Sequence, residues 1–242
     1  MASKANIAGM PLVRLAAVLA GILLSLSLLA LSLPRLAAGL LILPGEAVRE
    51  VYFDRRTYGK IGEASAELWR KSQVDAAAWV DSPEVFYEQA VVEQALMRLD
   101  DPANRDAHAE LARQAVTRSL ALAPVNGRAW LMLAIMESRL RGDPQVIREA
   151  LRASLIAAPY DPGLLAPRLR LGLSLWHTLD GDLARLMVAQ TSFFVAARRE
   201  DELRNIAAEF PDRVDDLMGG LDPADEASRA LLRPAHTSGE QG

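Results

Sequence analysis

The first pattern along the chain is an unbroken apolar stretch close to the N-terminus. Residues 15–33 read LAAVLAGILLSLSLLALSL and carry no charge. As a helix this stretch covers roughly 28 Å, close to the thickness of a bilayer core. A Pro-Arg pair interrupts it, and residues 36–43 are apolar again. We therefore predict a transmembrane anchor over residues 15–43, whose second apolar piece extends the span beyond a kink or lies in the interface.

Two other interpretations of this stretch remain open. A cleaved signal peptide would have an apolar region of only about 7–15 residues and a small-residue cleavage site, which is not clear here. A buried helix of a soluble protein is the other alternative. Lys4 and Arg14 favour a cytoplasmic N-terminus, although several arginines follow the span. We predict a cytoplasmic tail over residues 1–14 and a periplasmic body.

Helical patterns continue beyond the anchor. Residues 44–80 form a predicted juxtamembrane helical segment, in which aromatic and arginine side chains suit the headgroup level or a helix–helix contact. Ser82-Pro83-Glu84 has the cap, the proline and the acid that begin helices. Similar pairs are Asp101-Pro102, Asp143-Pro144, Asp161-Pro162 and Asp222-Pro223, while Gly142, Gly181 and Gly219-Gly220 are predicted helix ends.

These boundaries divide residues 81–232 into helical hairpins followed by shorter helices, and residues 233–242 form a predicted disordered tail. The predicted pairs are Pro83–Leu99 with Arg105–Leu122, Gly127–Arg141 with Pro144–Ala157, and Gly163–Thr178 with Leu183–Arg198, and the shorter helices are Glu202–Phe210, Asp212–Met218 and Pro223–Leu232.

One stretch recurs within this region. AVTRSLALAPVNGRAW at residues 115–130 returns as ALRASLIAAPYDPGLL at residues 150–165, with Ser, Ala and Pro at matching offsets. A period of about 34 residues is typical of helical-hairpin repeats. Each hairpin must bury one face on its neighbours, since two helices form no core alone.

The chain resembles the tetratricopeptide repeat family over roughly residues 83–198. Pro124, Trp130, Leu133 and Ala134 match that family's spacing, with an echo at Pro159 and Leu165. The departures are Glu137 in place of an aromatic, Arg168 in place of a leucine, and a spacing of 35. The resemblance implies an all-α fold, in which one transmembrane helix precedes a short α-solenoid whose inner helices line a concave, partner-binding face.

The whole layout is also similar to small membrane accessory proteins of bacterial envelope-polysaccharide polymerisation and export. One N-terminal span, a degenerate helical-repeat body and Ala158-Pro159-Tyr160-Asp161-Pro162 before an Arg/Leu-rich helix carry this similarity. It implies a place in exopolysaccharide or other envelope-polysaccharide biosynthesis at the inner membrane.

Composition excludes several classes of function. The chain has no Cys, which excludes disulfides, Cys-ligated zinc and thiol catalysis. Residues 1–43 hold three basic and no acidic side chains, so the remainder has a net charge of −7. Binding to nucleic acid requires a basic face that neutralises phosphates, so we expect no nucleic-acid partner.

No catalytic, metal or cofactor motif is present. The histidines His108, His177 and His236 lack metal-ligand spacing, and no phosphate loop or nucleophile elbow occurs. We interpret His177 as a surface or capping residue. The acid pairs Asp100-Asp101, Asp215-Asp216 and Asp225-Glu226 are sequential and suit caps or solvated turns better than the two separated carboxylates of a glycosidase.

Arginines on the predicted inner helices are the candidate binding residues. Arg128, Arg139, Arg168 and Arg170 could clamp a partner's carboxylates or an acidic glycan, or pair with nearby acids of the chain itself. We predict a non-enzymatic adaptor for other membrane or periplasmic proteins. The alternatives are a glycan-acting enzyme with acids in an unfamiliar motif, and a scaffold for cytochrome maturation or cell division.

Overall fold

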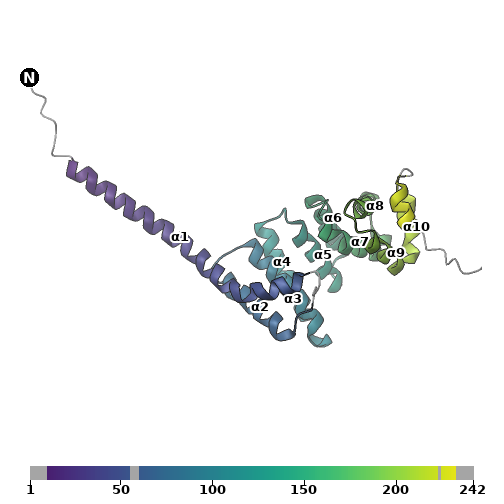
Figure 1. Cartoon of the computed structure of the whole chain (residues 1–242), viewed down its shortest axis with the longest axis horizontal. Coiled ribbons are helices and arrows are strands. Elements are labelled where there is room, and N and C mark those ends of the chain that lie inside the picture. The colour runs from purple at the N-terminus through teal and green to yellow at the C-terminus, as the bar shows by residue number, and fades with distance from the viewer. Residues whose placement is uncertain (1–9, 55–59, 223–224, 233–242) are drawn as a thin grey trace, which may run out of the picture. The chain divides into compact units, whose positions relative to one another are not determined.

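The structure is a computed structural model that describes residues 10–54, 60–222 and 225–232 (Figure 1). Those residues form eleven α-helices and short 3₁₀ turns, so the predicted all-α class is confirmed for this part of the chain. The predicted disordered tail, residues 1–9 of the predicted cytoplasmic tail, and the proline of the last Asp-Pro pair lie outside the described residues. The chain divides into two compact units, residues 1–85 and 86–242, which we describe separately.

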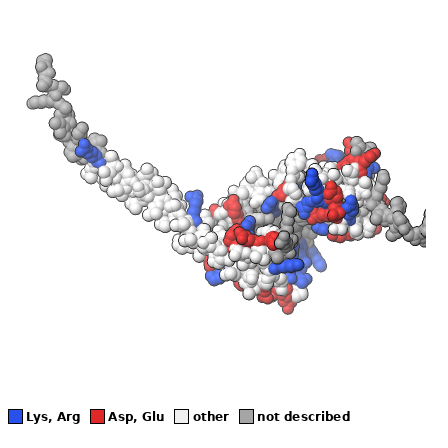
Figure 2. All heavy atoms as spheres, viewed as in Figure 1, with Lys and Arg blue, Asp and Glu red and all other residues white. Residues whose placement is uncertain are grey.

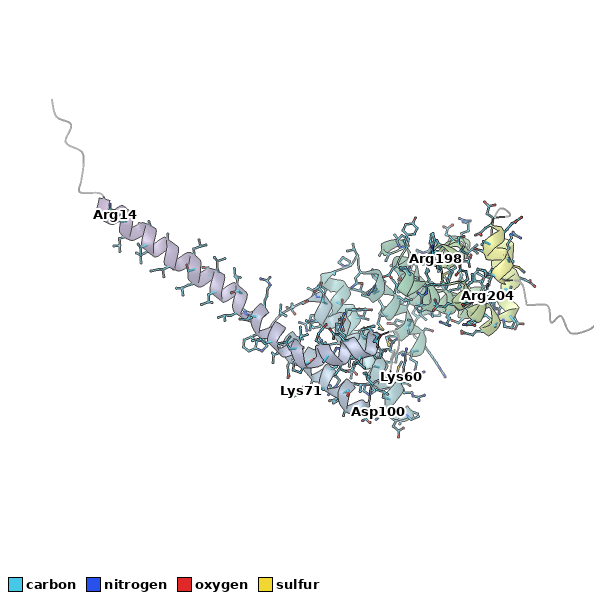
Figure 3. All side chains as sticks on the ribbon, in the orientation of Figure 1. Arg14, Lys60, Lys71, Asp100, Arg198 and Arg204 are labelled. Atoms are coloured by element: carbon cyan, nitrogen blue, oxygen red, sulfur yellow. The ribbon has the colours of Figure 1, made fainter. Side chains whose placement is uncertain are left out.

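The first helix, α1 (Met10–Phe53), is long and apolar enough to cross a membrane. It continues through Pro34 and Pro44, although each proline lacks the N–H that a helix interior uses, so the expected interruption does not end the helix. All described side chains from Arg14 to Leu33 are exposed. In Figure 2 the corresponding rod is almost entirely uncharged, and Arg14 lies near its N-terminal end (Figure 3). A signal sequence passes the same test of length and composition.

The second helix, α2 (Glu63–Ala77), packs antiparallel to the last third of α1. The Tyr52 ring lies 5.5 Å from the Trp69 ring, and at the other end Ala38 shares an apolar cluster with Ala76. Between these contacts the helices approach closely at Gly45, where an added Cβ would lie 2.1 Å from the Ser72 hydroxyl. One face of α1 is therefore covered from Ala38 onward by a helix of the same chain.

The remaining helices largely follow the predicted boundaries. They are α3 (Pro83–Leu99), α4 (Arg105–Leu122), α5 (Gly127–Arg139), α6 (Pro144–Ala157), α7 (Pro162–Ser174), α8 (Gly181–Ala196), α9 (Glu200–Glu209), α10 (Val214–Gly220) and α11 (Glu226–Leu232). Neighbouring helices pack in pairs, α5 on α6 and α7 on α8, and α5 also contacts α7. Small and aliphatic side chains fill the core of this unit, among them Ala112, Ala134 and Leu169, which are fully buried.

The recurring stretch forms two nearly identical turns. After α4, Ala123 has φ −138° and ψ 77°, and after α6, Ala158 has φ −144° and ψ 64°. Asn126 then accepts hydrogen bonds from the first backbone N–H groups of α5, and Asp161 accepts one from Gly163 of α7. The 35-residue period of the sequence thus corresponds to a repeated turn and a repeated cap.

Two helix ends differ from the expectation. Gly181 was predicted to end a helix, but it is the first residue of α8, because Asp180 caps that helix by accepting the N–H of Leu183. At the end of α5 the left-handed position belongs to Arg141, with φ 54°, and Gly142 follows it and donates to the carbonyl of Glu137. Arg198 takes the same conformation after α8. Gly219 and Gly220 do end α10, as predicted.

Candidate functional site

The predicted binding arginines lie on α5 and α7, the helices that the repeated turns introduce. Arg128 lies in the first turn of α5 and Arg139 ends this helix, 11 residues or roughly three turns later, so the two side chains leave the same face. Ile135 lies on that face of α5, and Arg170 follows Ile135 by the 35-residue period. We call the side chains of Arg128, Arg139 and Arg170 the arginine face.

Each member of the arginine face pairs with an acidic side chain. Arg128 donates from Nε to the Asp161 carboxylate at 2.9 Å, which joins the start of α5 to the cap of α7. Arg139 reaches Asp106 of α4 only at 3.9 Å, beyond hydrogen-bonding distance. The side chains of Arg128 and Arg139 are 59% and 41% exposed, so water screens both pairs.

Arg170 makes the best-formed of these pairs. Its Nε and Nη2 donate to both carboxylate oxygens of Glu209 on α9, at 2.8 and 2.9 Å. These hydrogen bonds raise the pKa of Arg170 and lower the pKa of Glu209 from their ordinary values. On the face drawn in Figure 2, basic and acidic side chains are intermixed over this unit, which agrees with such pairing.

Arg168 is not a surface residue. Its side chain is fully buried, and its guanidinium donates to the Ser154 hydroxyl at 3.0 Å, to the Ala158 carbonyl at 2.8 Å and to the Ser154 carbonyl. Burial lowers its pKa to about 10, and the charge of Asp161 opposes that shift. The cation therefore caps the C-terminal end of α6, where helix carbonyls lack partners. Arg168 presents no surface to a partner, and the candidate set narrows to the arginine face.

Sequence reasoning missed a three-residue cluster around His108. His108 on α4 contacts the Glu93 carboxylate of α3 through Nδ1 at 2.7 Å and the Asp100 carboxylate through Nε2 at 3.0 Å (Asp100 is labelled in Figure 3). Burial opposes the charged ring, but the two carboxylates outweigh it and raise the pKa of His108. The hydrogen bond from His108 lowers the pKa of Asp100. The cluster joins α3 to α4 and engages both ring nitrogens.

Other acids and histidines from the sequence analysis have contacts within the chain, and His236 lies outside the described residues. Asp101 caps the 3₁₀ turn before α4, and Asp225 accepts the backbone N–H of Ser228 in α11 as well as the hydroxyl of Ser192. His177 is exposed and contacts Arg213. Among the described residues no group of three or more His, Asp or Glu side chains could hold a metal ion.

Comparisons of the chain with protein families, with curated proteins and with solved structures gave no match. The described residues therefore form an all-helical protein with a long apolar helix near its N-terminus, paired helices behind it, and arginines on corresponding faces of α5 and α7.

Proposed function

We propose that this protein is a membrane-anchored, non-enzymatic adaptor that holds partner proteins at the bacterial inner membrane. In this proposal α1 is the single-pass anchor, the body lies in the periplasm, and residues 81–232 form a short tetratricopeptide-like solenoid. The arginine face contacts the partner.

The exposure of α1 is the observation that carries the proposal. Its large apolar side chains between Leu15 and Leu36 are each at least half exposed, on every face of the helix. Moving one such side chain out of water contributes about 1.5–3 kcal/mol, so more than ten of them favour a bilayer strongly. A cleaved signal sequence would explain the same residues without an anchor.

An extraction experiment separates the anchor from a signal sequence. The full-length chain carries a tag at each end, and membranes are washed at alkaline pH before mass measurement. An anchor leaves both tags on one membrane-bound chain. A chain that has lost its N-terminal tag and is released by the wash would overturn the anchor.

The repeated turn supports the adaptor half of the proposal. Two turns with matching backbone angles and caps introduce α5 and α7, so corresponding faces of these contacting helices carry the exposed arginines. Helical repeats stack in this way to present extended binding surfaces.

The ion pairs of the arginine face are weak enough to be exchanged. A surface salt bridge is worth about 0–1 kcal/mol, so a partner's carboxylate can replace Asp106 or Glu209 with little loss. A partially desolvated interface strengthens the new pair, and an arginine fork binds a carboxylate through two hydrogen bonds. The chemistry favours an acidic segment of a membrane or periplasmic protein, or an acidic glycan that such a protein carries.

Partner capture with charge-reversed variants tests the arginine face. The Arg139→Glu, Arg170→Glu double variant should lose the partner while keeping its helical content. Arg185→Glu is the matched control, because Arg185 on α8 is 78% exposed and pairs with Asp182 of its own helix. Equal capture by the wild type and the double variant would refute this surface.

From the resemblance to envelope-polysaccharide accessory proteins, we expect the partner to be a protein of envelope-polysaccharide polymerisation or export. Recovery of a glycosyltransferase, a polymerase or a polysaccharide exporter would support that assignment. Recovery of cytochrome-maturation or cell-division proteins would instead support a scaffold for that process. Glycan turnover by the purified chain would favour the alternative of a glycan-acting enzyme.

A further inference from the structure

One face of α1 carries a leucine, or in one case an isoleucine, every three and four residues in alternation. The residues are Leu15, Leu19, Ile22, Leu26, Leu29, Leu33, Leu36, Leu40 and Leu43. We call this row the leucine seam. Spacings of three and four that alternate without a break put apolar side chains at the a and d positions of a heptad, the pattern of helices that wind around each other.

The seam and α2 occupy opposite faces of α1. The residues of α1 that pack on α2, Ala38, Gly45 and Tyr52, follow one another at intervals of seven and occupy the f position of the same heptad. That position points away from a and d. Leu36, Leu40 and Leu43 remain 61%, 59% and 60% exposed, although the opposite face is covered.

The residues beside the seam are mostly small. In four heptads the e and g positions are Ala16, Val18, Leu23, Ser25, Ala30, Ser32, Ala37 and Gly39. Six of these eight are Ala, Ser or Gly, which let a second helix come close enough for the leucines to interlock. The basic residues Arg14, Arg35 and Arg49 share the c position, outside the seam and its flanks, and Glu50 at d ends the seam.

The seam is longer than a bilayer requires. From Leu15 to Leu43 it covers roughly 42 Å of helix, whereas a hydrocarbon core is about 30 Å thick. Lipid explains apolar side chains on all faces as far as Leu36. Beyond that point α2 covers Leu41 and Ile42, but nothing described in this chain explains why Leu40 and Leu43 are apolar.

We propose that two copies of the chain associate through the leucine seam as a parallel helix pair. Two copies of a single-pass protein have the same orientation in the membrane, so their helices run parallel and equal positions meet. In such a pair a leucine at a or d packs between four residues of the facing helix, and the two α2 helices lie on the outside. The pairing brings two bodies to the same side of the membrane, and it does not depend on which partner the arginine face binds.

Cysteine crosslinking tests the seam directly, because the chain has no Cys of its own. Single variants are made of the full-length chain in membranes: Leu26→Cys, Leu29→Cys, Leu33→Cys and Leu36→Cys on the seam, and Leu24→Cys, Leu28→Cys and Leu31→Cys off it. The two sets interleave along the helix, so depth and side-chain type are matched. A disulfide requires Cα atoms about 4.4–6.8 Å apart, which a close parallel pair offers only at the seam.

We expect mild oxidation to give a crosslinked dimer at the seam positions with a yield at least roughly fivefold above that of the other positions, so that yield rises and falls every 3.5 residues. Equal yields in both sets, or higher yields off the seam, would overturn the proposal, as would no dimer at any position.

A second measurement does not depend on disulfide geometry. The Leu36→Ala, Leu40→Ala variant should weaken self-association in detergent at least about tenfold, or about 1.4 kcal/mol. The matched Leu28→Ala, Leu31→Ala variant should leave it unchanged. Equal dissociation constants for the two variants, measured by energy transfer between labelled chains, would refute the seam as the interface.

Discussion

His108 provides the sharpest test of how the body is held together. The perturbation is His108→Ala, which removes the ring between Glu93 and Asp100. Glu93 is 5% exposed, so its carboxylate would lose its 2.7 Å partner in a nearly dry site. Removing one partner of a buried charged pair costs about 3–5 kcal/mol, whereas water screens the more exposed Asp100 contact. We expect a loss of about 3 kcal/mol, since His108 itself is partly exposed.

A second variant separates the charge from the packing. Glu93→Met with His108→Leu removes both buried partners, and replacing a buried ion pair by apolar side chains is often close to neutral. The double variant should recover most of the stability, to within about 1 kcal/mol of the wild type. Urea unfolding of the full-length chain in a mild detergent measures both. A loss below about 1 kcal/mol for His108→Ala, or a double variant no better than the single one, would refute this reasoning.

The same cluster predicts a pH dependence of stability. The folded pKa of His108 lies above its ordinary value of 6.5. The folded state therefore binds the proton more tightly, and this stabilisation is complete below pH 6.5 and is lost as the pH rises through the folded pKa. The groups facing the ring are Glu93 on α3, Asp100 in the following turn and, through Asp100, Asn104. The urea midpoint should fall from pH 6 to pH 8, and His108→Ala should remove most of that slope.

The remaining predictions concern three other positions. Gly45→Leu should separate α2 from α1 at a cost of about 1–3 kcal/mol, because its Cβ would meet Ser72 and Trp69. Faster limited proteolysis of the α1–α2 hairpin would show this separation. The control Gly39→Ala, whose Cβ meets nothing within 4 Å, should leave the proteolysis rate unchanged. Arg168→Lys should destabilise the body more than Arg168→Leu in urea unfolding, because lysine keeps the buried charge and loses the fork that binds the carbonyls of Ser154 and Ala158 at the end of α6. The opposite order would contradict the capping role. Arg141→Gly should stabilise the body by about 0.5–1 kcal/mol, since glycine adopts φ 54° without strain, and a lower urea midpoint for this variant would argue against it.

Helix boundaries were predictable where the cause is local. The Asp-Pro pairs at Asp143 and Asp161 begin α6 and α7 by accepting the N–H two residues later, which depends only on neighbouring residues. The predicted helix end at Gly181 was wrong because glycine also suits the first turn of a helix. The adjacent Asp180 caps α8, so the helix begins at Gly181. Pro34 left open whether the second apolar piece continues the helix, and α1 does continue through it because a long helix tolerates a missing hydrogen bond.

The site was less predictable, because it depends on contacts between distant residues. Arg168 and Arg170 are two residues apart in the sequence, yet one is buried against α6 and the other pairs with Glu209 on the surface. The two residues lie on different faces of α7, and this decides which of them is buried. The available clue was that an arginine stands at position 168, where the tetratricopeptide pattern has a leucine. The partners of His108 lie 8 and 15 residues away, so no short motif could reveal them.

The most direct test of the adaptor account is quantitative crosslinking and capture of the full-length protein from native membranes, followed by mass spectrometry. Wild type, the Arg139→Glu, Arg170→Glu variant and the Arg185→Glu control are compared at equal expression. The account predicts one set of membrane or periplasmic proteins that wild type and control capture equally and that the double variant loses by at least about tenfold, as expected when two charge-assisted contacts are reversed. The same proteins at the same yield from all three would contradict it.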